Sequence, residues 1–164
     1  SREAAAQLAR AAGCGVISLG DGIEGEAREV AGEQAALALR RKAGRRAGAA
    51  PLVFLSGGEL TVTRKGSGSG GPNAEFCLAL AMALEKAEGI HAVACDTDGV
   101  DGAAEVAGAV IGPETLAAAE RAGLDPVAAL AANDAHGFFA AIGGQIVTGP
   151  TLTNVNDFRA ILIL

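Results

Sequence analysis

Three carboxylates lie within the seven residues DTDGVDG, at Asp96, Asp98 and Asp101. Carboxylates this close repel one another unless a cation or strong hydrogen-bond donors hold them. Magnesium with a bound polyphosphate fits this chemistry, because Mg²⁺ needs only one or two carboxylates beside the phosphate oxygens. We therefore expect a magnesium and phosphate site at this loop. The alternative is a turn whose carboxylates are solvated.

Residues 65–76, KGSGSGGPNAEF, place several glycines ahead of a helix-like run and allow three interpretations. In a phosphate cradle, glycine N–H groups converge on an anion, and the helix beginning near Asn73 adds its positive end. The spacing Gly66-x-Gly68-x-x-Gly71 also matches a dinucleotide fingerprint. That fingerprint follows a strand buried on both faces, however, whereas LTVTRK alternates and ends in two cations. A flexible linker is disfavoured by the well-patterned flanks. We favour the cradle, with a plain glycine-rich turn as the structural alternative.

Other polar side chains stand next to apolar segments. Asn133 and Asp134 precede an apolar helix, where each taken singly is a typical cap. Residues 148–157, TGPTLTNVND, bring hydroxyl, amide and carboxylate groups between two predicted strands. His91 and His136 have no partners at ligand spacing, so we expect them to be structural.

The hydrophobic pattern predicts the elements that position these residues. A strand over 14–20, a long helix over 21–48 and an apolar strand over 51–56 form a βαβ unit. Because Leu60 and Val62 alternate with threonines after a glycine pair, residues 52–65 are expected to form two antiparallel strands joined by a Gly57-Gly58 turn.

Later segments continue the alternation of strands and helices. A helix begins at Pro72, a buried strand over 91–95 leads into the acidic loop, and a last apolar strand covers 158–164. The expected fold is therefore α/β: a mixed β-sheet with an antiparallel hairpin, and helices packed on the sheet.

Length, charge and composition limit the class of protein. The chain has 164 residues, which suits one α/β domain over 1–164. Its formal charge of −6 and its 3% aromatic content disfavour nucleic acid and anionic membrane surfaces as partners. Three cysteines without metal-type spacing indicate a reducing compartment, so we expect a cytoplasmic protein. The chain opens on Ser1 within a helical pattern, which suggests a piece of a larger protein.

Five motifs occur together and in order, and their series resembles a known family. They are SGGE, G-x-G-x-G-G-x-N-x-E, DTDGVDG, NDAHGFF and TGPTLTNVND. This series resembles the C-terminal MOFRL region of glycerate kinases of the glycerate 2-kinase type, whose members often carry the label hydroxypyruvate reductase. The stretch LGDGIEGEARE, residues 19–29, is similar to the segment that joins that region to the family's N-terminal domain. In this resemblance, residues 1–48 would form a leader of one strand and helices, and residues 51–164 would form the MOFRL-like core.

The resemblance implies phosphoryl transfer from ATP, with Mg²⁺, to a hydroxyl of D-glycerate, giving a phosphoglycerate, for which we expect 2-phosphoglycerate. It implies a cleft between this chain and an N-terminal domain that the chain lacks, so this chain by itself should be inactive. The expected partners are D-glycerate and that domain, with a homodimer as an option. The implied catalytic residues are Asp98 and Asp101, and the implied metal ligands are Asp96 and Asp98. The implied ATP and substrate residues are Gly57, Gly58, Glu59, Gly66, Gly68, Gly70, Gly71, Asn73, Glu75, Asn133, Asp134, Thr153, Asn154, Asn156 and Asp157.

The glycine stretch departs from the family pattern, which resembles G-x-G-R-G-G-R-N-Q-E. Ser69 and Pro72 stand where arginines are expected, and Ala74 stands in place of the glutamine. Because an arginine fork is the usual phosphate clamp, either phosphate binding is weakened or another group supplies the charge. Two other functions stay open: an NAD(P)H-dependent hydroxypyruvate reductase, and a non-catalytic domain that has lost its phosphate-binding arginines.

Overall fold

The computed structural model describes residues 2–102, 105–151 and 156–164. The helices are α1 Arg2–Ala11, α2 Ala27–Ala43, α3 Pro72–Leu84, α4 Thr115–Arg121, α5 Pro126–Ala131 and α6 Ala135–Ile142. The strands are β1 Gly15–Gly20, β2 Gly25–Glu26, β3 Leu52–Gly57, β4 Leu60–Thr61, β5 Ile90–Asp96, β6 Gly108–Ile111, β7 Gln145–Ile146 and β8 Asp157–Ile163.

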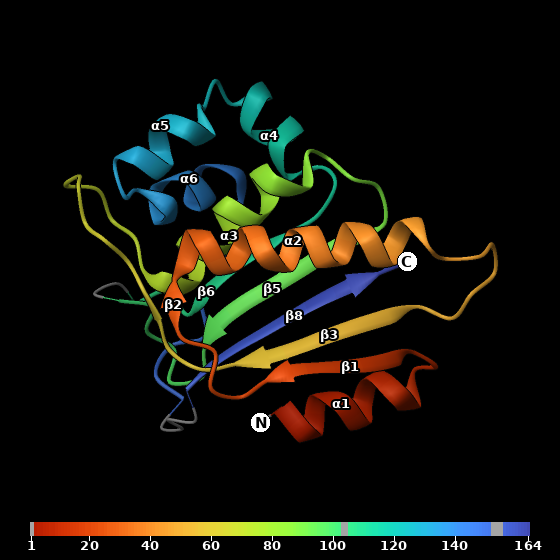
Figure 1. The fold of residues 1–164 in the computed structure, drawn as a ribbon. Helices are drawn as coiled ribbons and strands as arrows, with labels where there is room; N and C mark the ends of the chain where they lie inside the picture. Colours follow the sequence, from red (N-terminus) through yellow and green to blue (C-terminus); the bar gives the residue numbers. More distant parts are fainter. Residues whose placement is uncertain (1, 103–104, 152–155) are drawn as a thin grey trace.

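One six-stranded sheet organises the chain, in the order β1-β3-β8-β5-β6-β7 (Figure 1). Strand β1 runs parallel to β3, and β8 lies antiparallel to both of its neighbours, β3 and β5. β6 is antiparallel to β5, and β7 is antiparallel to β6. The last strand of the chain therefore lies in the middle of the sheet.

Alternation along the strands assigns each face of the sheet to different helices. Phe54, Ala92 and Ile161 belong to a large buried cluster that includes residues of α2 and α3. On the opposite face, Val53 and Leu55 pack with Ala6 of α1. Helices α4, α5 and α6 gather around α3 (Figure 1). The sheet thus has α2 and α3 on one face and α1 on part of the other.

The expected α/β class with a mixed sheet and helices packed on it is confirmed. The predicted βαβ unit is also present, because β1 and β3 are parallel neighbours on either side of α2 in the sequence. Pro72 occupies the first turn of α3, where its missing N–H costs no hydrogen bond. Antiparallel pairs of consecutive strands do exist, but they are β5 with β6 and β6 with β7.

The hairpin predicted over residues 52–65 is wrong. Strand β4 pairs in parallel with β2 in a separate two-stranded sheet and does not fold back on β3. Strand β4 cannot pair with β3, because β1 and β8 already pair with β3 on its two sides. Beyond β4, the Glu26 carboxylate accepts hydrogen bonds from the N–H and hydroxyl of Thr63, at 2.7 Å and 3.1 Å.

Two further differences concern element boundaries. The long helix begins at Ala27 and not near residue 21, because Gly20 and Gly25 adopt positive φ angles of 125° and 130° that a helix excludes. Strand β6 is an element that the sequence pattern does not predict. It is four residues long and is paired on both sides.

Candidate functional site

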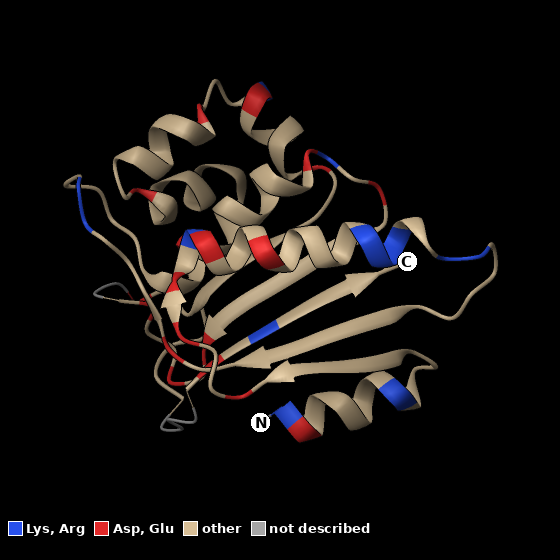
Figure 2. Cartoon of the chain, viewed as in Figure 1, with Lys and Arg blue, Asp and Glu red and all other residues tan. Residues whose placement is uncertain are grey.

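The topology brings several predicted site residues to one end of the sheet. Because β8 is antiparallel to both β3 and β5, the carboxyl ends of β1, β3 and β5 lie at the same edge as the start of β8. Gly57, Asp96 and Asp157 stand at these strand ends. Acidic residues gather in the loops of this edge (Figure 2). Ligands of α/β proteins bind outside the carboxyl ends of strands, so this edge is the natural place for a site.

A cleft of about 780 Å³ opens at this edge, and we call it the strand-end cleft. Its lining includes four of the residues predicted for ATP or substrate: Gly57, Gly58, Asn156 and Asp157. The rest of the lining is Arg2, Glu3, Ala4, Ala5, Leu8, Asp21, Ser56, Thr97 and Phe158. The cleft thus combines an apolar wall from α1 with polar groups from the strand ends.

Asp96 and Asp98 form a tight turn at the end of β5. The N–H of Asp98 donates to Asp96 Oδ1 at 3.0 Å, and the N–H of Val100 donates to Asp98 Oδ1 at 2.8 Å. Burial, and secondarily the Asp98 and Asp157 carboxylates, raises the pKa of Asp96 above its ordinary value. This crowded pair of carboxylates fits a magnesium ion, which needs only one or two such ligands. The described residues contain no group of three or more His, Cys, Asp or Glu at metal-binding positions.

Asp101 is buried, and both of its carboxylate oxygens hold the start of α3. Oδ1 accepts from the N–H of Asn73 at 2.9 Å, and Oδ2 accepts from the N–H of Ala74 at 2.8 Å. Burial raises the pKa of Asp101, and these hydrogen bonds oppose that shift. His136 lies behind it, with Nε2 3.0 Å from the Asp101 carbonyl oxygen. The geometry gives Asp101 the role of the anion at this helix N-terminus.

Several N–H groups of the glycine stretch, which we expected to face a phosphate, bind other parts of the chain. The N–H groups of Lys65 and Gly66 both donate to Asn133 Oδ1, at 2.7 Å and 2.9 Å. The N–H of Gly68 donates to the Ala132 carbonyl, and that of Ser69 to Asp134 Oδ1. Together with the α3 amides on Asp101, these N–H groups are satisfied within the chain. The stretch is therefore anchored on the turn between α5 and α6.

Close packing explains why glycines occupy this stretch. A Cβ added at Gly66 would lie 2.3 Å from the Ala132 carbonyl oxygen, and one at Gly68 would lie 2.5 Å from Asp134 Cβ. A Cβ at Gly71 would lie 2.5 Å from the Asp101 carboxyl carbon. Each contact is too short for a side chain, so the glycines are required by neighbouring chain segments.

A buried polar network connects this stretch to α2. Glu75 is 1% exposed and accepts from Arg28 Nε at 2.6 Å and from Asn133 Nδ2 at 3.0 Å. Arg28 also donates to the Leu130 carbonyl at 2.7 Å. Arg28 was not predicted as a site residue from the sequence, where it is one of several charged residues of a long helix.

Asn73 extends the network to the strand-end cleft. Its Nδ2 donates to Asp101 Oδ1 at 3.2 Å and to Asp157 Oδ1 at 2.8 Å. Asp157 in turn pairs with Arg159, whose Nη1 lies 3.2 Å from Asp157 Oδ2. Arg159 is wholly buried on β8 and was not predicted as a site residue. The sequence feature that could have identified Arg159 is that it is the single cation of the apolar strand FRAILIL, at a position that alternates in step with the buried isoleucines.

The remaining predicted residues have different surroundings. Glu59 is exposed beyond the Gly57-Gly58 turn. Thr153 and Asn154 lie outside the described residues. Asn133 and Asp134 hold the glycine stretch and do not line the strand-end cleft.

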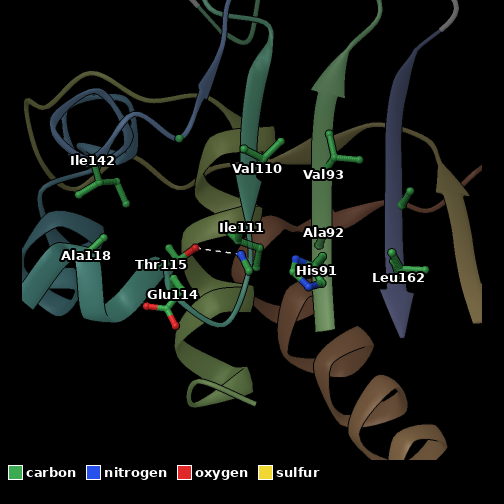
Figure 3. Close-up of a pocket in the computed structure, with 13 residues that line it drawn as sticks. His91, Ala92, Val93, Val110, Ile111, Glu114, Thr115, Ala118, Ile142 and Leu162 are labelled. Carbon is green, nitrogen blue, oxygen red and sulfur yellow. Dashed lines mark hydrogen bonds between the residues drawn. The ribbon is translucent and has the colours of Figure 1, made fainter. Parts of the chain in front are cut away.

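A second hollow of about 530 Å³ lies elsewhere on the sheet (Figure 3). Val110, Val93 and Leu162, from three neighbouring strands, line it beside Ala118 of α4 and Ile142 of α6. None of the predicted site residues lines this hollow. Its position and apolar lining separate it from the carboxylates and amides at the strand ends.

Comparison with known proteins assigns the family. The sequence profile described as the MOFRL family matches residues 52–157. The chain belongs to the MOFRL family. All the predicted site residues fall inside the MOFRL match, whereas Arg159 lies two positions beyond it.

Relatives of this MOFRL chain are longer proteins. It is 52% identical over 163 residues to a putative hydroxypyruvate reductase from Agrobacterium vitis, covering 98% of this chain and 37% of that protein. It is 40% identical over 114 residues to the D-glycerate 2-kinase of Thermotoga maritima, covering 70% of this chain and 27% of that protein. The chain spans less than half the length of these relatives.

A solved structure has the same fold. The crystal structure of glycerate kinase from Thermotoga maritima superposes with a TM-score of 0.90 at 35% identity. The match covers 99% of this chain and 39% of that one. No described helix of this MOFRL chain is long and apolar enough to span a membrane, and its three cysteines are free.

Proposed function

We propose that this chain is the C-terminal part of an ATP-dependent glycerate kinase that phosphorylates D-glycerate to 2-phosphoglycerate. The strand-end cleft carries the proposal, because Gly57, Asn156 and Asp157 line one hollow beside the Asp96–Asp98 turn. Phosphoryl transfer needs positioning and charge neutralisation more than covalent chemistry, and such a set supplies positioning and metal ligands. The printed names of the Thermotoga relatives, D-glycerate 2-kinase and glycerate kinase, support the choice of substrate.

The carboxylates divide into two roles in this proposal. Asp96 and Asp98 each engage one carboxylate oxygen in the turn, and the second oxygen of each is the one we propose as a magnesium ligand. When bound there, magnesium would neutralise charge on phosphate oxygens. Asp98 is also our candidate for receiving the proton of the substrate hydroxyl. For Asp101, which the resemblance implied to be catalytic, we propose a positioning role, because both of its carboxylate oxygens accept hydrogen bonds from the start of α3.

The residues of the cleft lining would meet the substrate. Asn156 and Asp157 offer an amide and a carboxylate to the hydroxyls of glycerate. Among the described residues of this lining, Arg2 is the cation, and it already pairs with Asp21. The phosphates of ATP need more positive charge than this. We therefore propose that an N-terminal domain completes the cleft and supplies that charge, which would leave this chain inactive by itself.

A second candidate is the NAD(P)H-dependent hydroxypyruvate reductase. The printed name of the Agrobacterium relative favours it. The glycine stretch counts against it, because a dinucleotide would need N–H groups that Asn133, Asp134 and Asp101 already engage. The preceding strand, β4, is also only two residues long and lies outside the large sheet. A non-catalytic domain is the third candidate, and absence of both activities would favour it.

Two parallel assays separate these candidates. The longest natural polypeptide that contains this chain is incubated with D-glycerate and MgATP, and ADP release is followed. The same preparation is incubated with hydroxypyruvate and NADH or NADPH, and cofactor oxidation is followed. We expect glycerate-dependent ADP release and no oxidation of the nicotinamide. Oxidation without ADP release would replace the kinase by the reductase.

A further inference from the structure

Arg159 is a buried cation behind the lining of the strand-end cleft, where it contacts two residues of that lining, Asp157 and Gly58. It is 0% exposed, and its Nη1 and Nη2 contact two different segments of the cleft lining. Nη1 lies 3.2 Å from Asp157 Oδ2, and Nη2 donates to the Gly58 carbonyl at 3.2 Å. The guanidinium also lies over the ring of Phe76 in α3, 5.8 Å from its centroid. One side chain therefore links β8, the Gly57-Gly58 turn and α3.

A contribution to folding stability does not by itself explain why an arginine is buried at position 159. Taking a guanidinium and a carboxylate out of water costs several kcal/mol per ion, and well-packed apolar residues often replace a buried pair without loss. Burial lowers the pKa of Arg159 below its ordinary value, and Asp157 opposes that shift. Nε of Arg159 has no hydrogen-bond partner among the described residues, so the cation is not even fully satisfied.

The two partners of Arg159 are both groups that the proposed reaction needs in place. Asp157 is held from its other side by Asn73 Nδ2, which also contacts Asp101. Gly58 has a φ of 113° and lies against Ile23, whose N–H donates to the Gly57 carbonyl at 3.1 Å. Without Arg159, the Asp157 carboxylate would lose its cation and the Gly58 carbonyl would lose its hydrogen bond to β8.

We propose that Arg159 is a positioning residue, which fixes the Asp157 carboxylate and the Gly57-Gly58 turn in one arrangement across the strand-end cleft. This inference deepens the proposed function and rests on it for the reaction concerned. The arginine fork suits the task because its planar donors reach two acceptors at once, which a lysine ammonium does less well.

The test compares Arg159→Met, Arg159→Lys and the double variant Arg159→Met with Asp157→Asn in the longest natural polypeptide that contains this chain. Arg121→Met, an exposed arginine at the end of α4, is the matched control. We expect Arg159→Met to lower kcat by about a hundredfold with a small change in KM, since a misplaced group acts mainly in the transition state. Arg159→Lys should retain part of kcat, and the control should retain all of it.

The double variant separates positioning from folding. Removing both charges should restore the thermal midpoint toward that of the unaltered protein, because no unpaired buried charge remains. Its kcat should stay low. Recovery of kcat together with the midpoint would overturn the inference, because Arg159 would then matter only for folding.

A further measurement does not depend on activity. Hydrogen exchange of the Ile23 amide reports the Gly57-Gly58 turn directly, through its bond to the Gly57 carbonyl. We expect Arg159→Met to speed this exchange by about tenfold while amides of α2 keep their protection. Unchanged exchange at Ile23 would contradict the positioning role. If the unaltered protein makes no phosphoglycerate, the proposed function fails, and the exchange result still decides the role of Arg159.

Discussion

At the scale of single residues, the acidic turn after β5 combines a cost in stability with the proposed metal site. Burial, and secondarily the neighbouring carboxylates, raises the pKa of Asp96. The folded chain therefore binds that proton more tightly than the unfolded chain does. Ionised Asp96 lowers the free energy of unfolding at neutral pH, and this penalty vanishes once the pH falls below the ordinary aspartate value.

Asp96→Asn should therefore stabilise the folded protein and weaken its use of magnesium. At pH 7 we expect a thermal midpoint about 1–3 °C higher, with the difference from the unaltered protein disappearing below about pH 4. The KM for magnesium should rise in the same variant, because a metal ligand has become an amide. Glu88→Gln, at an exposed glutamate, is the control and should change neither quantity. A lower midpoint for Asp96→Asn at pH 7 would contradict the burial penalty.

The sequence predicted the three aspartates as one site, and the structure gives them different surroundings. The Asp96-x-Asp98-x-x-Asp101 spacing pointed to one ligand site, yet Asp101 holds α3 while Asp96 and Asp98 form the turn. Which way a carboxylate in a loop points depends on the segment that packs against it. Arg159 was missed because the sequence of an apolar strand does not show on which face of the sheet its single arginine lies. Arg159 alternates in step with Ile161 and Ile163, so all three side chains are on the buried face of β8.

At the scale of elements, the Gly57-Gly58 turn is held by a contact that only glycine permits. A Cβ at Gly58 would lie 2.3 Å from the Ile23 carbonyl oxygen, on a backbone with φ 113°. We expect Gly58→Ala to lower the free energy of unfolding by about 2–4 kcal/mol, from strain and forced displacement together. Gly123, with φ 70° and open space around its Cα, is the matched control.

Urea unfolding of both variants separates the two causes. Gly123→Ala should cost about 1 kcal/mol, because only the left-handed backbone is penalised there. The excess at Gly58 measures the contact with Ile23. Equal losses in the two variants would mean that the turn is free to move away from Ile23.

The partners that hold the glycine stretch could not be predicted from the sequence. Asn133 Oδ1 accepts from two of its N–H groups, and no local sequence pattern links residues 68 positions apart. The loop also exposes Arg64 and Lys65, both trypsin sites. We expect Asn133→Ala to speed tryptic cleavage after these residues, because local opening becomes easier when the anchor is lost.

Limited proteolysis followed by mass analysis checks this expectation. The free energy of unfolding should fall by about 1–3 kcal/mol, since Glu75 also loses a donor. Thr115→Ala, which removes a hydrogen bond to the Gly112 N–H at the start of α4, is the control and should not speed cleavage in the loop. Unchanged cleavage after Arg64 and Lys65 in Asn133→Ala would show that other bonds hold the stretch.

At the scale of the whole molecule, the sheet explains why the site assembles where it does. Periodicity predicted β1, α2 and β3 as a parallel unit, and the last strand as apolar. It did not predict that β8 inserts between β3 and β5, because sequence periodicity carries no information about strand order. That insertion brings Asp157 beside Asp96 and makes one cleft from segments far apart in the chain.

The central claim is that this cleft belongs to a glycerate kinase, and phosphorus NMR tests it most directly. The longest natural polypeptide that contains this chain and the 164-residue chain alone are each incubated with D-glycerate and MgATP. We expect a new phosphomonoester signal of 2-phosphoglycerate, with matching loss of ATP, from the longer polypeptide only. A longer polypeptide that consumes no ATP and yields no phosphoglycerate would contradict the account.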